Sequence, residues 1–137
     1  MNDTIELVID SKYESVDEVA SASRLASDRM GFDDETSGWV ELAVREAVIN
    51  AIKHGNRQSR DKKVDIQFVM GPENLTVFVR DRGAGFDAAN APDPLNPRNL
   101  LNPDGRGIFF MRTFMDQVEH SIHPEGGCVV RMLKLKK

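Results

Sequence analysis

The chain has 137 residues, 40% of them hydrophobic, which suffices to bury the core of one domain without metal or disulfide staples. Its 18 basic and 22 acidic side chains leave a net charge of −4, which argues against non-specific binding to nucleic acid or to an anionic membrane. The lone Cys128 excludes an internal disulfide, and the sequence shows neither a signal peptide nor an apolar run of membrane-spanning length. We therefore expect a cytoplasmic protein, a single domain over residues 1–137, whose partners are proteins and small molecules.

The chain begins with the pattern of a strand followed by a helix. Residues 4–10, TIELVID, place apolar side chains at every second position, as a half-buried strand does. Residues Ser15–Glu18, SVDE, have the pattern of a capping box, which predicts the start of a helix that ends before Gly31. The apolar positions of this helix are Val16, Val19, Ala22, Leu25, Ala26 and Met30.

A second helix follows and is the most apolar segment of the chain. Asp33 or Asp34 is its expected N-cap, because a short carboxylate can accept a hydrogen bond from the backbone at the helix start. Apolar positions continue through Ile52, and Gly55 supplies the expected stop.

Two alternating stretches, residues 64–70 and 75–81, predict a β-hairpin joined by GPEN. The composition then changes to Asn, Asp and Pro from Phe86 to Asp104, where four prolines exclude a regular element for most of the segment. Loops of this length within compact domains are usually functional lids or disordered segments.

The last part of the chain predicts a helix over residues 105–116, a strand over 117–122 and a closing strand over 128–136. Grouped strands with hairpin links favour an antiparallel or mixed sheet with helices on one face. The expected fold class is thus α+β, a two-layer sandwich of a mixed, mainly antiparallel sheet.

Polar side chains form a row on the second helix. Glu46, Asn50 and His54 are four residues apart and so lie about 40° from one another around an α-helix, with Lys53 beside them. The row could be simply the solvated side of an amphipathic helix, but Asn50 is a poor helix former in mid-helix. A carboxylate and an amide oxygen one turn apart suit Mg²⁺, whereas one histidine supplies too few ligands for zinc.

A second polar motif, Asp-x-Gly-x-Gly, ends the strand over residues 75–81 with Asp81, Gly83 and Gly85. Glycines at this spacing let the backbone approach a ligand closely or adopt a positive φ. An ordinary surface turn after a strand would have the same composition.

The third motif is Gly105, Arg106 and Gly107, directly before an apolar helix. Unpaired backbone N–H groups at a helix N-terminus bind phosphate, and an arginine there adds a charged donor. Taken alone, this motif also fits an ordinary loop.

The order of the three motifs around a long loop carries a resemblance that none of them carries alone. The chain resembles the histidine-kinase-like ATPase superfamily, the Bergerat-type fold shared by DNA gyrase, the heat-shock chaperone ATPase, mismatch-repair proteins and two-component sensor kinases. Within it the short domain is similar to bacterial anti-sigma-factor serine/threonine kinases. The resemblance is densest from Leu42 to Asp116.

For the phosphate side, the resemblance implies that Asn50 coordinates the Mg²⁺ of a bound ATP and that Glu46 is the general base. Lys53 and His54 would lie near the phosphates, and Gly105, Arg106 and Gly107 would hold them.

For the adenine side, the resemblance implies that Asp81 accepts a hydrogen bond from the adenine amino group while Gly83 and Gly85 make room for the base. Residues 86–104 would be the lid over ATP. Two positions depart from the family pattern: Arg82 stands where many relatives carry Asn, and Cys128 stands where many carry Thr.

The function that the resemblance implies is an ATP-dependent serine/threonine protein kinase of the anti-sigma-factor type. Its partners would be a sigma factor and a small anti-anti-sigma-like protein, its substrate; a homodimer is also implied. One alternative is a nucleotide-gated anti-sigma or scaffold protein that binds ATP without phosphoryl transfer, although the presence of Glu46 favours an enzyme. Another is the catalytic part of a histidine kinase, but no helical hairpin with a phosphoacceptor histidine precedes the site.

Overall fold

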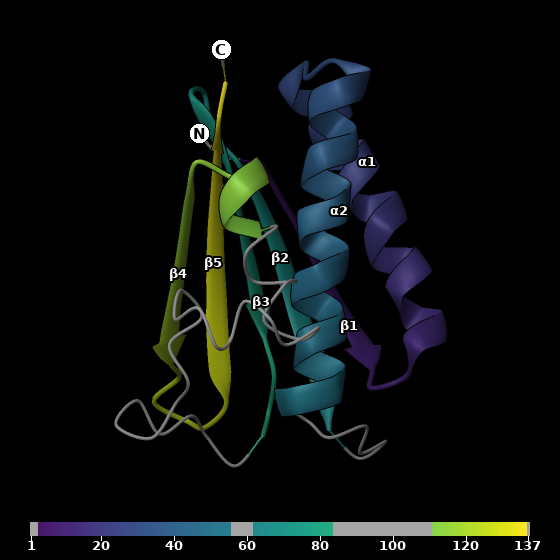
Figure 1. The fold of residues 1–137 in the computed structure, drawn as a ribbon, viewed down its shortest axis with the longest axis vertical. Helices are drawn as coiled ribbons and strands as arrows, with labels where there is room; N and C mark the ends of the chain where they lie inside the picture. The colour runs from purple at the N-terminus through teal and green to yellow at the C-terminus, as the bar shows by residue number, and fades with distance from the viewer. Residues whose placement is uncertain (1–2, 56–61, 84–110, 137) are drawn as a thin grey trace.

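The chain folds into one five-stranded sheet with two long helices packed on one of its faces (Figure 1). A computed structural model describes residues 3–55, 62–83 and 111–136. The elements are β1 (Asp3–Asp10), a 3-10 turn (Tyr13–Ser15), α1 (Val16–Met30), α2 (Asp34–Asn50), a π-helical turn (Ala51–Gly55), β2 (Lys63–Met70), β3 (Asn74–Arg80), β4 (Gln117–Ile122) and β5 (Cys128–Leu135). This confirms the α+β two-layer sandwich.

The strands lie in the order β1-β2-β3-β5-β4, and all four pairings are antiparallel, so the described sheet is antiparallel rather than mixed. The predicted hairpin of β2 and β3 is confirmed, with Asp65 opposite Arg80. Because β5 pairs with β3 as well as β4, Arg80 at the end of β3 lies opposite Val129 at the start of β5. The turn between β4 and β5 therefore meets the chain where it leaves β3.

The hydrophobic core lies between the sheet and the two helices. Alternate residues of β2 and β3 point toward the helices, as the period of two predicts. Each fully buried aliphatic side chain contributes about 1.5–3 kcal/mol, so this layer holds α2 firmly against the sheet. The residues of this layer are Val64, Ile66, Phe68, Leu75, Val77 and Val79 from the sheet and Val40, Val44, Val48 and Ile52 from α2 and its extension.

Helix α2 begins at the N-cap that the sequence predicts. The Asp33 carboxylate accepts a hydrogen bond from the Thr36 backbone N–H at 2.7 Å, and this bond lowers the pKa of Asp33. Of the two candidates, Asp33 is thus the cap. At the other end of the preceding helix, Gly31 adopts φ 76° and closes α1.

The predicted capping box at the start of α1 is wrong. Ser15 has φ −72° and ψ −16°, a helical conformation, and its side chain makes no capping hydrogen bond. An N-cap needs an extended backbone, whereas here the chain enters α1 through the 3-10 turn at Tyr13–Ser15.

The buried side of α1 also differs from the expected one. Leu25 is 46% exposed, while Ser23 and Ser27 are completely buried. Helix α1 packs against α2 as well as the sheet, so two neighbours, and not its apolar pattern alone, determine which of its residues are buried.

Helix α2 contacts the segment before β4 through a pair of aromatic rings. The rings of Trp39 and Phe114 stack with centroids 6.0 Å apart, and the Lys134 ammonium lies 5.8 Å from the Trp39 ring centre.

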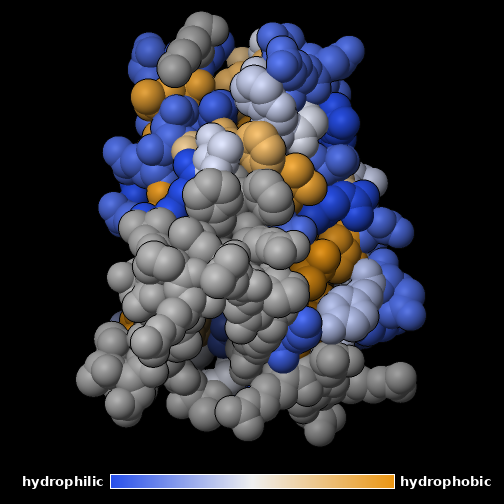
Figure 2. Space-filling model, viewed as in Figure 1, coloured by the Kyte–Doolittle hydropathy of each residue, from blue (hydrophilic) through white to orange (hydrophobic). Residues whose placement is uncertain are grey.

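Hydrophobic residues reach the surface on the upper part of the face shown in Figure 2. Among the helices that the structure describes, none is long and apolar enough to cross a membrane.

Candidate nucleotide site

Two element ends and one turn lie together at one end of the molecule. The C-terminal end of α2, the C-terminal end of β3 and the turn between β4 and β5 all lie at the lower end in Figure 1, away from both chain termini. Helix α2 carries Glu46 and Asn50, and Asp81 follows β3 directly. The topology therefore gathers the first two predicted polar motifs at one end of the sandwich.

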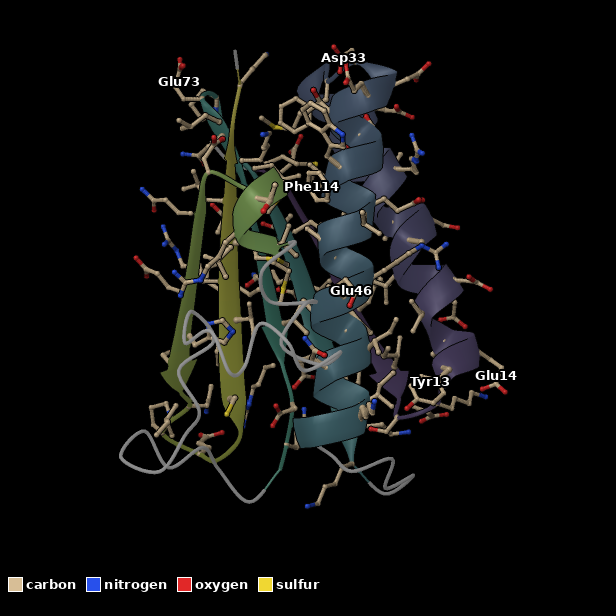
Figure 3. All side chains as sticks on the ribbon, viewed as in Figure 1. Tyr13, Glu14, Asp33, Glu46, Glu73 and Phe114 are labelled. Atoms are coloured by element: carbon tan, nitrogen blue, oxygen red, sulfur yellow. The ribbon has the colours of Figure 1, made fainter. Side chains whose placement is uncertain are left out.

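Glu46 and Asn50 lie one turn apart on the last part of α2, as the sequence predicts. Both side chains are partly buried, whereas Lys53 is exposed. Figure 3 shows Glu46 in the lower half of α2, on the side turned to the viewer. A half-buried carboxylate on a helix that the core holds in place has a defined position, as a proton acceptor in a site requires.

The predicted row requires α-helical spacing as far as His54, but this spacing ends at Asn50. From Ala51 to Gly55 the backbone is π-helical, with i→i+5 hydrogen bonds that change which residues share a side. The spacing of four that groups Glu46 with Asn50 therefore does not extend to His54, whose side chain lies outside the described residues. Short π-helical turns of this kind occur frequently at functional sites.

Asn50, the last α-helical residue, has an amide with an unsatisfied donor. Its Nδ2 atom is buried and finds no hydrogen-bond acceptor among the described residues. Leaving a buried polar atom unpaired costs about 1–3 kcal/mol, so an ordered water, an ion or a ligand commonly supplies the missing partner. An amide offers one oxygen acceptor and one NH₂ donor, which fits a magnesium ion together with a phosphate oxygen.

Asp81 is buried, with 7% of its surface exposed, and the backbone around it holds its carboxylate. Its Oδ1 accepts hydrogen bonds from the backbone N–H of Gly83 at 3.0 Å and of Cys128 at 3.1 Å. Within the described part of the chain, no donor binds Oδ2. The carboxylate is thus oriented through one oxygen, and the other can accept a hydrogen bond from a ligand.

Arg82, which departs from the family pattern, is engaged elsewhere. Its guanidinium forms a bidentate ion pair with Asp65 on β2, with N···O distances of 2.8–3.0 Å. This pair links the end of β3 to the neighbouring strand, and it gives Arg82 a role that needs no nucleotide.

Gly127, in the turn before β5, is a site residue that the sequence motifs did not single out. It is buried, its backbone adopts φ 86°, and it lies against the backbone of Asp81 and Arg82. The only signal in the sequence is the pair Gly126 and Gly127 in EGGCVV, which reads as a simple turn until the topology places it beside β3.

The Cys128 side chain shares this environment. Burial, with a further contribution from the Asp81 carboxylate, raises the pKa of the Cys128 thiol to about 11. A neutral thiol is a weak hydrogen-bond partner and, at neutral pH, a poor nucleophile.

We expect the Cys128 thiol to react about ten-fold more slowly with iodoacetamide near pH 8 in the folded protein than in the urea-unfolded chain. The raised pKa lowers the fraction of Cys128 present as thiolate. This decrease has a larger effect on the rate than the greater nucleophilicity of a thiolate with a higher pKa. The rate should rise steeply as the pH increases toward the pKa, and mass spectrometry of timed samples measures it. Equal rates in the folded and unfolded chain, with the fold checked by circular dichroism at each pH, would contradict the shift.

Several predicted site residues lie outside the described residues: Gly85, the lid at 86–104, and Gly105, Arg106 and Gly107. Their predicted roles stay predictions. The groups that the structure does place are Glu46, Asn50 and Lys53 on the helical side and Asp81 and Gly83 at the end of β3.

Comparisons with known proteins agree with this geometry. Residues 9–134 match the family described as the histidine kinase-like ATPase domain. The serine-protein kinase RsbW of Bacillus pumilus (strain SAFR-032) is 30% identical over 145 aligned positions, which cover 98% of this chain and 88% of that protein. The proteins of the same name from Listeria monocytogenes serovar 1/2a (strain EGD-e) and Bacillus subtilis (strain 168) are 31% and 29% identical and cover 95% and 96% of this chain. The chain therefore belongs to the histidine kinase-like ATPase domain family, as the order of its motifs predicts.

Proposed function

We propose that the chain is an ATP-dependent serine/threonine protein kinase that acts as an anti-sigma-factor-type regulator and phosphorylates a small anti-anti-sigma-like protein. Membership of an ATPase family supports the use of ATP. Relatives that match nearly the whole chain are named serine-protein kinases, which supports a hydroxyl side chain as the acceptor. We propose that the whole chain works as one domain, in the cytoplasm and as a homodimer.

On the adenine side, we assign the recognition of the base to Asp81. Its Oδ1 is already occupied by two backbone N–H groups, so Oδ2 would accept the hydrogen bond from the exocyclic amino group of adenine. Because the carboxylate is buried, this charged hydrogen bond is worth about 1.5–3 kcal/mol. Gly83, with Gly85 after it, would leave room for the ring.

On the phosphate side, we assign the metal to Asn50. Its amide would place an oxygen on Mg²⁺ and direct the buried NH₂ group, which has no acceptor among the described residues, to a phosphate oxygen. When bound, Mg²⁺ neutralises negative charge on the phosphates. Lys53 and His54, with Gly105, Arg106 and Gly107, complete the proposed phosphate site.

In the transfer step, Glu46 would act as the general base. A serine or threonine oxygen of the partner attacks the γ-phosphorus, and the hydroxyl proton passes to the Glu46 carboxylate. A new P–O bond forms as the bond between the γ-phosphorus and the β,γ-bridging oxygen breaks, which leaves ADP. Since phosphoryl transfer depends mainly on positioning and charge neutralisation, the role of Glu46 is limited to accepting this proton.

One observation carries the proposal: the buried amide nitrogen of Asn50, which has no acceptor among the described residues, lies one turn from the partly buried carboxylate of Glu46. On the solvated side of an amphipathic helix, the nitrogen of an asparagine amide would be hydrogen-bonded to water and not buried. A bound magnesium–nucleotide would supply the missing partner of the Asn50 amide and would place the γ-phosphate near Glu46.

The test is a capture of partners from the native cytoplasm in the presence of Mg·ATP, followed by incubation with γ-labelled ATP. We expect label on a serine or threonine of a small retained protein, located by phosphosite mapping. Bound nucleotide without any labelled hydroxyl residue would instead identify the nucleotide-gated switch, and the kinase assignment would fail.

A further inference from the structure

The turn between β4 and β5 approaches the end of β3 so closely that position 127 has no room for a side chain. A Cβ atom added to Gly127 would lie 2.0 Å from the carbonyl oxygen of Asp81, 2.8 Å from its carbonyl carbon and 3.1 Å from the Cα of Arg82. These are backbone atoms, which cannot rotate away as a flexible side chain could. Any side chain here must displace either the turn or Asp81.

The same turn is hydrogen-bonded to Asp81 from both directions. The Asp81 backbone N–H donates to the Cys128 carbonyl at 3.0 Å, and the Cys128 N–H donates to the Asp81 carboxylate at 3.1 Å. One residue earlier, the Arg80 guanidinium donates to the Gly126 carbonyl at 3.2 Å. A shift of the turn is therefore passed directly to the Asp81 carboxylate.

The turn also has a defined conformation of its own. The Gly126 N–H donates to the His123 carbonyl, and the His123 N–H donates to the Gly127 carbonyl, both at 2.9 Å. Because these bonds close the turn, it acts as one unit against the end of β3.

We infer that Gly127 is a positioning residue that makes the site selective for adenine. Its lack of a side chain lets the turn press against Asp81 and hold Oδ1 through the Cys128 N–H, which directs Oδ2 toward the base. This inference rests on the proposed function, since it takes Asp81 as the group that reads the adenine amino group. It adds a residue whose effect is on the choice of base and not on the phosphates.

Gly126 provides a matched control. It has φ 106°, also in the left-handed region, but an added Cβ atom there meets no heavy atom within 4 Å. Gly126→Ala and Gly127→Ala thus share the backbone strain of an L-residue at positive φ. Only Gly127→Ala adds a collision with Asp81.

The experiment measures the affinities of ATP and inosine triphosphate, which has a carbonyl oxygen in place of the amino group, by calorimetry in the full chain. We expect the unaltered protein and Gly126→Ala to prefer ATP by about ten- to a hundred-fold. Gly127→Ala should lose most of this preference, because ATP binding weakens while binding of inosine triphosphate changes little. A folded Gly127→Ala variant that keeps the full preference would overturn the inference, as would an equal loss in both glycine variants.

A second variant keeps the test decisive if Gly127→Ala does not fold. Arg80→Gln removes the guanidinium that donates to Gly126 without adding an atom near Asp81, and its preference for ATP should fall several-fold. An unchanged preference in this variant would then overturn the inference. An unaltered protein that binds both nucleotides equally would overturn it together with the adenine role of Asp81, whereas a preference for ATP that survives both substitutions leaves that role intact.

Discussion

Glu46→Ala is expected to lower the rate of phosphoryl transfer by about a hundred- to ten-thousand-fold, because a positioned general base contributes about that factor. ATP affinity should remain close to that of the unaltered protein, since the carboxylate acts on the proton of the incoming hydroxyl and not on the nucleotide. Single-turnover transfer from γ-labelled ATP to the partner measures the first quantity, and calorimetry measures the second.

A matched control lies on the same helix. Glu35→Ala removes an exposed carboxylate from the first turn of α2, at the opposite end from the site, and should leave transfer unchanged. Normal transfer by the Glu46→Ala variant would rule out Glu46 as the base. A parallel loss of ATP affinity would point to a binding role instead.

The second large effect is expected from Asp81→Asn, which should weaken ATP binding about ten- to a hundred-fold. The asparagine oxygen can still accept the hydrogen bonds from Gly83 and Cys128, so the turn should keep its place. The other atom becomes an NH₂ group that faces the adenine amino group, which replaces an attraction with two opposed donors. Calorimetric titration with ATP gives the affinity, and circular dichroism reports whether the fold persists.

The control for this substitution is Asp34→Asn, which makes the same chemical change in the exposed first turn of α2. It should bind ATP as the unaltered chain does. If Asp81→Asn bound ATP with unchanged affinity while folded, another group would have to read the base.

These two substitutions separate the two ends of the proposed site. Loss of Glu46 removes an interaction made only in the transition state, so it lowers the rate constant of transfer. Loss of Asp81 removes an interaction made equally in the bound nucleotide and in the transition state, so it lowers the affinity. The pair therefore tests the assignment of catalytic and binding roles independently.

The sequence by itself determined most of the fold, because the fold follows local periodicity. Alternating apolar residues predict β2 and β3, and the structure buries those same residues. Asp33 and Gly31 mark helix ends through their own backbone preferences. The order of the three polar motifs around the long loop also predicted the family that the family match shows, since motifs keep their sequence order whatever their distances in space.

Only the tertiary structure decided which residues contact one another across the fold. The π-helical turn after Asn50, the exposed Leu25 and the missing cap at Ser15 depend on how the helices enter and pack, which no local pattern records. The close approach of Gly127 to Asp81 joins residues 46 positions apart and exists because β5 pairs with β3. In β2 and β3, hydrophobic periodicity specifies which side of the strand is buried, but the pairing of strands specifies which loop meets a functional carboxylate.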